Sequence, residues 1–200
     1  CRMGKLQVYE KSNRGYKRVS RGYIVIAQNN DTTDYLEQAY ALALNLKLTQ
    51  TVVSNLTVCV DAETKKLIKA KHKKIFDSIV DIPWQDDAKD AEWKINNKWK
   101  YYYMSPYDET VILDTDMIFP TDVSHWWDIM SQRDVWATTK VRTYRGEVVS
   151  SNFYRKYFAT NELPNVYTAF FYFKKSELAS ELFAMIEIIF QHWQRMFFKY

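Results

Sequence analysis

Two carboxylates separated by one residue follow an apolar run near the middle of the chain. Residues 110–113 have the composition of a buried strand, and Asp114-Thr115-Asp116 comes directly after it. At a strand end the backbone turns, so both carboxylates can reach one hard cation. Oxygen ligands suit Mg²⁺ or Mn²⁺, which keep positions open for waters and substrate phosphates. We therefore expect Asp114 and Asp116 to bind Mn²⁺ or Mg²⁺ against a diphosphate leaving group; a solvated turn or a helix cap is the alternative interpretation.

A second polar strand end lies near the beginning of the chain. Residues 23–27 form a continuous apolar run that ends in Gln28-Asn29-Asn30-Asp31. In an open α/β sheet, ligands bind beyond the carboxyl ends of the strands. We therefore expect residues 23–27 and 111–113 to be adjacent or near-adjacent parallel strands, because their polar ends must converge on one ligand.

Strands and helices alternate along the chain. Apolar runs predict strands at residues 23–27, 56–60, 76–82, 110–113, 135–139 and 166–173. Spacings of three and four predict helices at residues 35–48, 62–74, 93–104 and 122–131, and a long helix after Ser176. The long helix carries Leu178, Leu182, Met185, Ile189, Trp193 and Phe197 on one face. This order predicts an α/β fold, a Rossmann-like mixed but mainly parallel sheet flanked by helices.

Composition excludes several classes of protein. The chain has 200 residues with 47% hydrophobic and 26% charged side chains, which argues against disorder. Only 4 glycines argue against glycine-rich phosphate loops. Two cysteines make neither a disulfide framework nor a zinc site, and Cys59 is expected in the core. With no membrane-spanning stretch and no signal peptide visible, we expect a cytoplasmic protein.

Basic residues concentrate in two segments. Residues 1–22 hold seven lysines or arginines and one acid, which predicts a solvated arm or a tag ahead of the domain at residues 23–200. Residues 65–74 hold six lysines, and His72 among them is expected to be solvated. A basic scaffold that binds an anionic polymer through these two segments is one alternative function.

The acidic segment and its surroundings resemble a known family. Residues 112–118, Ile-Leu-Asp-Thr-Asp-Met-Ile, are similar to the Asp-x-Asp segment of GT-A glycosyltransferases, and most of all to family 8, the glycogenin and lipopolysaccharide galactosyltransferase type. Lys98 and residues 107–110 resemble the helix and turn before the family's metal strand, and residues 122–127 resemble the aromatic-rich helix after it. The opening strand with Asn30, Asp31 and Tyr35 resembles the family's nucleotide-binding start. The resemblance covers about residues 23–190 and implies the GT-A type of the predicted sheet.

The resemblance implies a role for individual residues. Asp114 and Asp116 would hold the metal, with Asp114 also near the donor ribose. Asn30 and Tyr35 would meet the base, and Lys98 would reach the phosphates or the sugar. The nucleotide-sugar set that it implies is Gln28, Asn30, Asp31, Tyr35, Lys98, Asp114, Thr115 and Asp116; Tyr167 and Thr168 would meet the donor sugar or the acceptor.

This sequence also departs from the family pattern. Tyr167 stands where the family has Asn, and Ala169 where it has Gly. The family supplies a further metal-binding His late in the chain. Here His192 is expected to be a packed or surface residue, and His125 is the better outside candidate. Because the sequence ends at Tyr200, we expect the third metal ligand and part of the active site to lie beyond it; no general base can be placed.

The function expected from these observations is metal-dependent transfer of a sugar from a UDP-sugar to an acceptor, with retention of anomeric configuration. The acceptor is a glycan, a protein or a nucleic acid, and the basic residues of 142–164 admit an anionic one. One alternative is a sugar-nucleotide nucleotidyltransferase, but residues 28–34 lack its Gly- and Arg-rich loop. The other is a non-catalytic module that binds a nucleotide sugar or an anionic polymer. Donor sugar and oligomeric state are not encoded in these patterns.

Overall fold

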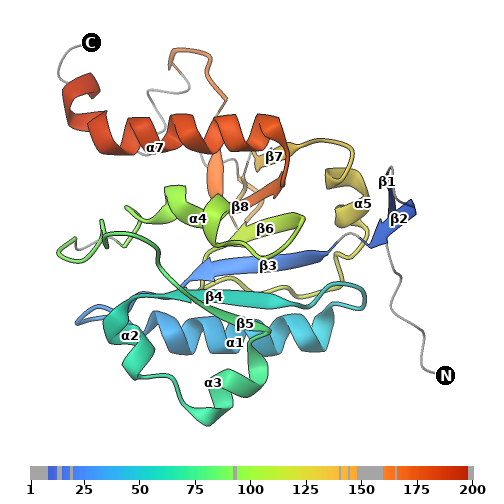
Figure 1. Cartoon of the computed structure of the whole chain (residues 1–200), viewed down its shortest axis with the longest axis horizontal. Helices are drawn as coiled ribbons and strands as arrows, with labels where there is room; N and C mark the ends of the chain where they lie inside the picture. The colour runs from blue at the N-terminus through green and yellow to red at the C-terminus, as the bar shows by residue number, and fades with distance from the viewer. Residues whose placement is uncertain are drawn as a thin grey trace.

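One six-stranded sheet organises the chain. The computed structural model describes residues 9–12, 15–18, 20–91, 94–139, 141–143, 145–147, 160–164 and 166–197. The strand order is β5-β4-β3-β6-β8-β7 (Figure 1). These strands are β3 (Arg21–Ile26), β4 (Leu56–Val60), β5 (Ser78–Asp81), β6 (Glu109–Leu113), β7 (Val135–Thr138) and β8 (Tyr167–Lys174).

The sheet is mainly parallel, as predicted. β3 pairs in parallel with both β4 and β6, and β4 pairs in parallel with β5. β8 is antiparallel to β6 and to β7. The register of β3 and β6 sets Ile24 beside Ile112, so their carboxyl ends lie together. The prediction that these two strands are parallel neighbours is confirmed.

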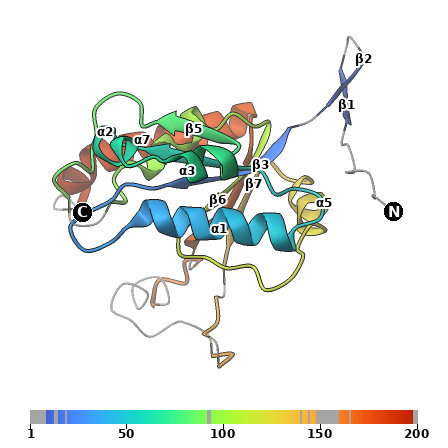
Figure 2. The same cartoon turned by 90° about the horizontal axis from the view of Figure 1, so that it is seen from below.

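Helices cover both faces of the sheet (Figures 1 and 2). On one face, α1 (Tyr35–Thr49) packs with α5 (Trp126–Met130) on the apolar side chains of β3, β4 and β6. On the other, α4 (Tyr101–Met104) and α7 (Glu177–Phe197) pack over Ile24, Cys59 and Phe173. Two short helices, α2 (Ala62–Lys66) and α3 (Ala70–Ile75), connect β4 to β5. Cys59 is buried in this core as predicted.

The described part of the amino-terminal segment contains a hairpin and the start of β3. β1 (Tyr9–Ser12) and β2 (Gly15–Arg18) form an antiparallel hairpin. Arg21 and Gly22, which the basic composition assigned to the arm, belong to β3, and Arg21 is buried against Glu109. Ser20, also assigned to the arm, is exposed, and its hydroxyl donates to Asp108 Oδ2 at 2.8 Å. The side chains of residues 1–19 lie outside the described residues.

Three helix predictions need correction. The helix expected at residues 62–74 is two helices, α2 and α3. The helix expected at 93–104 is a 3₁₀ turn, η1 (Lys98–Lys100), followed by α4, because the Asn96 and Asn97 side chains bond to the preceding loop. The helix expected at 122–131 begins only at Trp126, since Asp122 and Ser124 form a turn.

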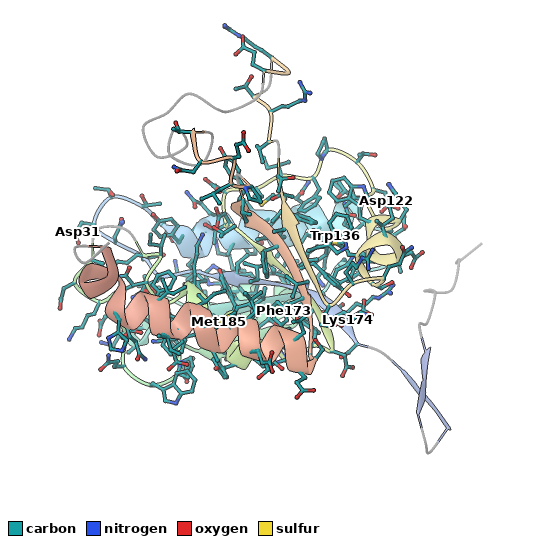
Figure 3. All side chains as sticks on the ribbon, turned by 90° about the horizontal axis from the view of Figure 1, so that it is seen from above. Asp31, Asp122, Trp136, Phe173, Lys174 and Met185 are labelled. Carbon is teal, nitrogen blue, oxygen red and sulfur yellow. The ribbon has the colours of Figure 1, made fainter. Side chains whose placement is uncertain are left out.

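The packing face of α7 was also predicted wrongly. Leu178, Met185 and Ile189 are exposed, whereas Ala179 and Phe183 are buried against the sheet. Figure 3 shows Met185 on α7, and the ring of Phe173 on β8 contacts the ring of Phe183. The helix is apolar around most of its circumference, so spacing alone does not choose its inner face. Within the described residues, no helix is long and apolar enough to cross a bilayer.

Candidate functional site

A cavity of about 240 Å³ lies where β3 and β6 end. Six of the predicted site residues line it, three from the segment after β6 and one each from the end of β3, from α1 and from η1. The full lining is Ile26, Gln28, Tyr35, Lys94, Ile95, Lys98, Tyr101, Leu113, Asp114, Thr115 and Asp116. The structure therefore joins residues that are up to about ninety positions apart in the sequence.

Asp114 is held by the lysine that the sequence singled out. The Lys98 ammonium donates to Asp114 Oδ1 at 2.7 Å. The two side chains are 23% and 37% exposed, so the pair faces the cavity and not the core. The Asp114 backbone N–H donates to the carbonyl of Ala169 on β8, which fixes the strand end beside the antiparallel strand. The Asp114 carboxylate is therefore held in place beside the cavity.

Asp116 differs from Asp114 in having no side-chain partner among the described residues. Its side chain is exposed, and among the described residues no hydrogen bond or ion pair reaches its carboxylate. Between the two aspartates, Thr115 is buried and its hydroxyl donates to Gln38 Oε1 at 2.9 Å. Thr115 therefore anchors the turn on α1, and the two carboxylates stay at the surface of the cavity.

Gln28 is buried, and both ends of its amide are occupied. Its Nε2 donates to Asp86 Oδ2 at 2.7 Å, and its Oε1 accepts from Asn97 Nδ2 at 3.0 Å. Burial would raise the pKa of Asp86, but the bonds from Asn97 and Gln28 outweigh it and lower that pKa below its ordinary value. Gln28 thus ties the loop after β5 to the end of β3, so that Lys98 lies over the strand ends.

Asn30 and Asp31 do not line this cavity. The Asn30 Oδ1 accepts from the backbone N–H groups of Thr32 and Thr33, so this side chain closes its own turn. Asp31 is exposed at the same end of the molecule (Figure 3). Tyr35, at the first turn of α1, is half-buried and does line the cavity.

Tyr167 and Thr168 on β8, the residues predicted for the donor sugar or the acceptor, lie in different surroundings. Thr168 lines an apolar cavity of about 180 Å³ that shares Lys98 and Tyr101 with the first one. Tyr167 lines neither, and its carbonyl accepts from the Thr138 hydroxyl at 3.1 Å. Of the basic residues in 142–164 that were expected to admit an anionic acceptor, Arg155 and Lys156 lie outside the described residues, and Arg142 and Arg145 line neither cavity.

Tyr101 is a site residue that sequence reasoning missed. Its phenol oxygen accepts from the Ile26 N–H at 3.0 Å. Burial, and then the charge of Asp114, raise the pKa of Tyr101 well above its usual value, so it stays a neutral phenol. The available signal was its position three residues after Lys98, which places both on one helical face.

No histidine joins the two aspartates. His125 directly precedes α5 and lies near the amino end of β4, because the adjacent Ser124 hydroxyl accepts from the Val52 N–H ahead of that strand. His192 is exposed on α7. His72 is fully buried and bonds to Glu37 and Lys69, so its expected solvation was wrong. The described residues contain no group of three or more His, Cys, Asp or Glu side chains placed for a metal.

The donor chemistry of this site fits Mn²⁺ or Mg²⁺ held with outside ligands. Asp114 and Asp116 supply hard oxygen atoms, and within the described part of the chain Asp116 has no protein partner. Mg²⁺ is usually bound through one or two carboxylates, with waters and substrate phosphates completing the shell. Two aspartates on an exposed cavity wall match that pattern and do not make a closed structural site.

The fold is similar to that of solved structures. Over 85% of this chain and 73% of the other, the structure is similar to mouse xyloside xylosyltransferase 1 in its apo form, with a TM-score of 0.51 and 11% identity. Two further similar structures are a 4-diphosphocytidyl-2C-methyl-D-erythritol synthase from Anaerococcus prevotii (88% and 77% covered, 12% identity, TM-score 0.41) and a CMP:2-keto-3-deoxy-manno-octonic acid synthetase complexed with CTP (88% and 78%, 10%, 0.44).

Sequence comparisons add no family. No family model matches the chain, and no curated protein sequence matches it. The chain is thus defined by its architecture: a Rossmann-like α/β fold of the GT-A kind, which it shares with the xylosyltransferase. The predicted fold class is confirmed, and membership of family 8 stays a prediction.

Proposed function

We propose that this protein is a metal-dependent glycosyltransferase that takes a sugar from a nucleotide sugar, with UDP as the nucleotide. The observation that carries the proposal is the cavity where β3 and β6 end, in which Lys98 neutralises Asp114 while Asp116 is left open. The xylosyltransferase fold supports the same interpretation. The proposal leaves the class of acceptor open and includes retention of the anomeric configuration.

The charged residues of the cavity would have different roles in binding the nucleotide sugar. Asp114 and Asp116 would hold the cation, which supplies positive charge to a departing diphosphate. Lys98, displaced from Asp114, would donate to the phosphate oxygens, where a charge-assisted hydrogen bond is strong. Tyr35 lies where it can contact the nucleoside, and Tyr101 offers a neutral phenol beside Asp114. Asn30 would reach the base only after leaving its own turn.

The alternative of an anionic-polymer module loses support from the lysine segment. Three of its six lysines are already ion-paired: Lys65 with Asp81, Lys66 with Glu63 and Lys71 with Glu37. A surface on which acidic side chains neutralise the lysines attracts polyanions only weakly. Among the described residues, no contact favours the nucleotidyltransferase alternative over the glycosyltransferase.

Calorimetry with Mn²⁺ and UDP on the wild type, Asp116→Asn and Asp122→Asn tests the proposal. Asp116→Asn should weaken Mn²⁺-dependent UDP binding by about 100-fold, the equivalent of about 2.7 kcal/mol. Its melting temperature should not fall, because Asp116 has no partner to lose among the described residues. Asp122→Asn, a carboxylate at the other end of the sheet, should bind like the wild type.

Two results would contradict the proposal. If Asp116→Asn binds Mn²⁺ and UDP as the wild type does, the Asp-x-Asp segment is only a turn. If UDP, ADP and GDP bind with equal affinity, UDP is the wrong nucleotide although the metal site stands. Release of UDP from UDP-sugars, against formation of pyrophosphate from UTP and a sugar phosphate, separates a glycosyltransferase from a nucleotidyltransferase.

A further inference from the structure

A second and larger cavity adjoins the first one. Its volume is about 680 Å³, against about 240 Å³ for the cavity of Asp114, and Ile95 lines both. Its walls come from the loop after β5 and from the C-terminal half of α7, which lie at the same end of the molecule as the carboxyl end of β3 (Figure 1). The donor function proposed above leaves this groove unused.

One wall of the groove is polar and carries a neutralised carboxylate. Asp87 Oδ1 accepts from Gln85 Nε2 at 2.8 Å, and Oδ2 accepts from Trp99 Nε1 and pairs with Lys100, both at 3.1 Å. The Lys100 ammonium is completely buried and also bonds to Asn97 Oδ1 and to the Gln85 carbonyl, which uses all three of its donors. Asp87 is therefore a fixed hydrogen-bond acceptor whose charge is already balanced.

The polar wall is held firmly in place. Trp84 stacks on Trp99 with ring centroids 5.5 Å apart and planes 5° apart. Its φ of 61° lies in the left-handed region, which is costly for a bulky side chain and persists only where surrounding contacts impose it. The loop therefore presents Asp87 and its neighbours as a preformed surface.

The opposite wall is apolar and open. Ile95 is 46% exposed and Ile189 on α7 is 52% exposed, and Phe190 lies beside them. Among the described residues that line the groove, none is a lysine or an arginine. A ligand for this groove needs an apolar face, hydroxyl donors along one edge and no net negative charge, because the described lining offers an anion no cationic side chain to pair with.

We propose that this groove binds the acceptor, and that the acceptor is a neutral saccharide. One C–H face of a sugar ring would pack on Ile95 and Ile189, while its hydroxyls donate to Asp87 and meet the amides of Gln85 and Asn96. The volume is in the range of about 300–1,000 Å³ that small ligands fill. Calling the sugar an acceptor rests on the proposed function, since Ile95 joins the groove to the donor cavity.

A blocking variant tests the inference. Gln191 lines the groove and is exposed on α7, and among the described residues its side chain bonds to Glu187 of the same helix. Gln191→Trp should therefore fold and fill the space. Leu178→Trp places the same side chain on an exposed position of α7 outside the groove. The probes are lactose, maltose, cellobiose and a sulfated chondroitin disaccharide, followed by saturation-transfer NMR.

At least one neutral disaccharide should bind the wild type and Leu178→Trp and bind Gln191→Trp at least about 10-fold more weakly. Mn²⁺-dependent UDP binding should be equal in all three proteins. The inference is overturned if no neutral disaccharide binds, if the sulfated one binds more tightly, or if Gln191→Trp binds the sugar normally. Weaker UDP binding in Gln191→Trp also overturns it, because the groove would then belong to the donor.

The two proposals fail separately. Saccharide binding that Gln191→Trp abolishes, in a protein with no Mn²⁺-dependent UDP binding, supports the groove and removes the glycosyltransferase. UDP binding without saccharide binding removes the groove and leaves the donor site intact.

Discussion

Charged side chains are paired differently at the two ends of β3 and β6. At the amino ends of β3 and β6, Arg21 lies beside Glu109 in register, and their side chains, 7% and 4% exposed, form an ion pair of 2.8 Å. At the carboxyl ends, Asp114 has a single lysine partner and is 37% exposed, and Asp116 is open. Figure 3 shows the separation, with Asp122 near one end and Asp31 near the other. The buried, paired charges at the amino ends stabilise the fold, whereas the more exposed carboxylates at the carboxyl ends are available to bind a ligand.

Asp122 extends the pattern at the amino end. It accepts hydrogen bonds from the Ser124 and Thr51 hydroxyls, and these bonds lower its pKa to about 2. They join the C-terminal end of α1 to the turn before α5. This half-buried carboxylate therefore serves the fold, since its hydrogen bonds hold two segments together.

The largest expected effect is on stability at the amino end. Arg21→Met leaves Glu109 buried without its partner, so the free energy of unfolding should fall by about 3–5 kcal/mol. Urea denaturation measures this loss. Lys47→Met breaks an ion pair with Asp77 that is one-third exposed, and should cost less than about 1 kcal/mol. Both pairs lie at the amino ends of the strands, so equal losses in the two variants would show that burial does not decide how much such a pair stabilises the fold.

A smaller effect, on binding, is expected at the carboxyl end. Lys98→Ala should weaken UDP binding by about 10-fold, because a charged donor to the phosphates is lost. The same variant should bind Mn²⁺ alone more tightly, since the ammonium no longer competes for Asp114 Oδ1. Titration with Mn²⁺, with and without UDP, separates the two. Lys98→Arg keeps the charge and should retain UDP binding; loss of binding there would show that position, and not charge, decides.

The smallest effect is an acid-sensitive loosening of the loop at residues 84–91. Hydrogen bonds in the folded protein lower the pKa of Asp86 below its ordinary 3.8. The stabilisation is therefore complete above pH 3.8 and is lost as the pH falls through the lowered value. Hydrogen exchange at low pH should show this loop opening, and Asp86→Asn should remove the pH dependence there. An unchanged pH dependence in Asp86→Asn would assign it to another carboxylate.

Much of the fold was accessible from the sequence because buried parallel strands are apolar throughout. The run that ends at Ala27 and the run that ends at Leu113 predicted β3, β6 and their adjacency. Where a helix is apolar around most of its circumference, the spacing does not predict which face packs on the sheet. In α7 the buried side chain is Phe183, whereas the spacing favoured Leu182 and Met185. His72 was misplaced because lysines surround it in sequence, whereas its own ring contacts Tyr40 and Phe76.

The candidate site was predictable where its residues are local, and less so where it depends on distant partners. Asp114 and Asp116 follow from three consecutive residues. The Gln28 amide is hydrogen-bonded to Asp86 and Asn97, which lie 58 and 69 positions away in the sequence. No local pattern predicts such contacts. Asn30 was expected at the ligand, but it satisfies the backbone of its own turn, a common use of a short amide.

The position of β6 has a consequence for how the protein folds. This strand lies between β3 and β8, and its pairing with β3 joins residues 88 positions apart. Closing so long a loop costs chain entropy before any contact repays it, and such non-local pairings slow folding. We expect β3, β4 and α1 to associate first and β6 to insert later. The two carboxylates would then meet their lysine only near the end of folding, so early intermediates would have no site to occupy.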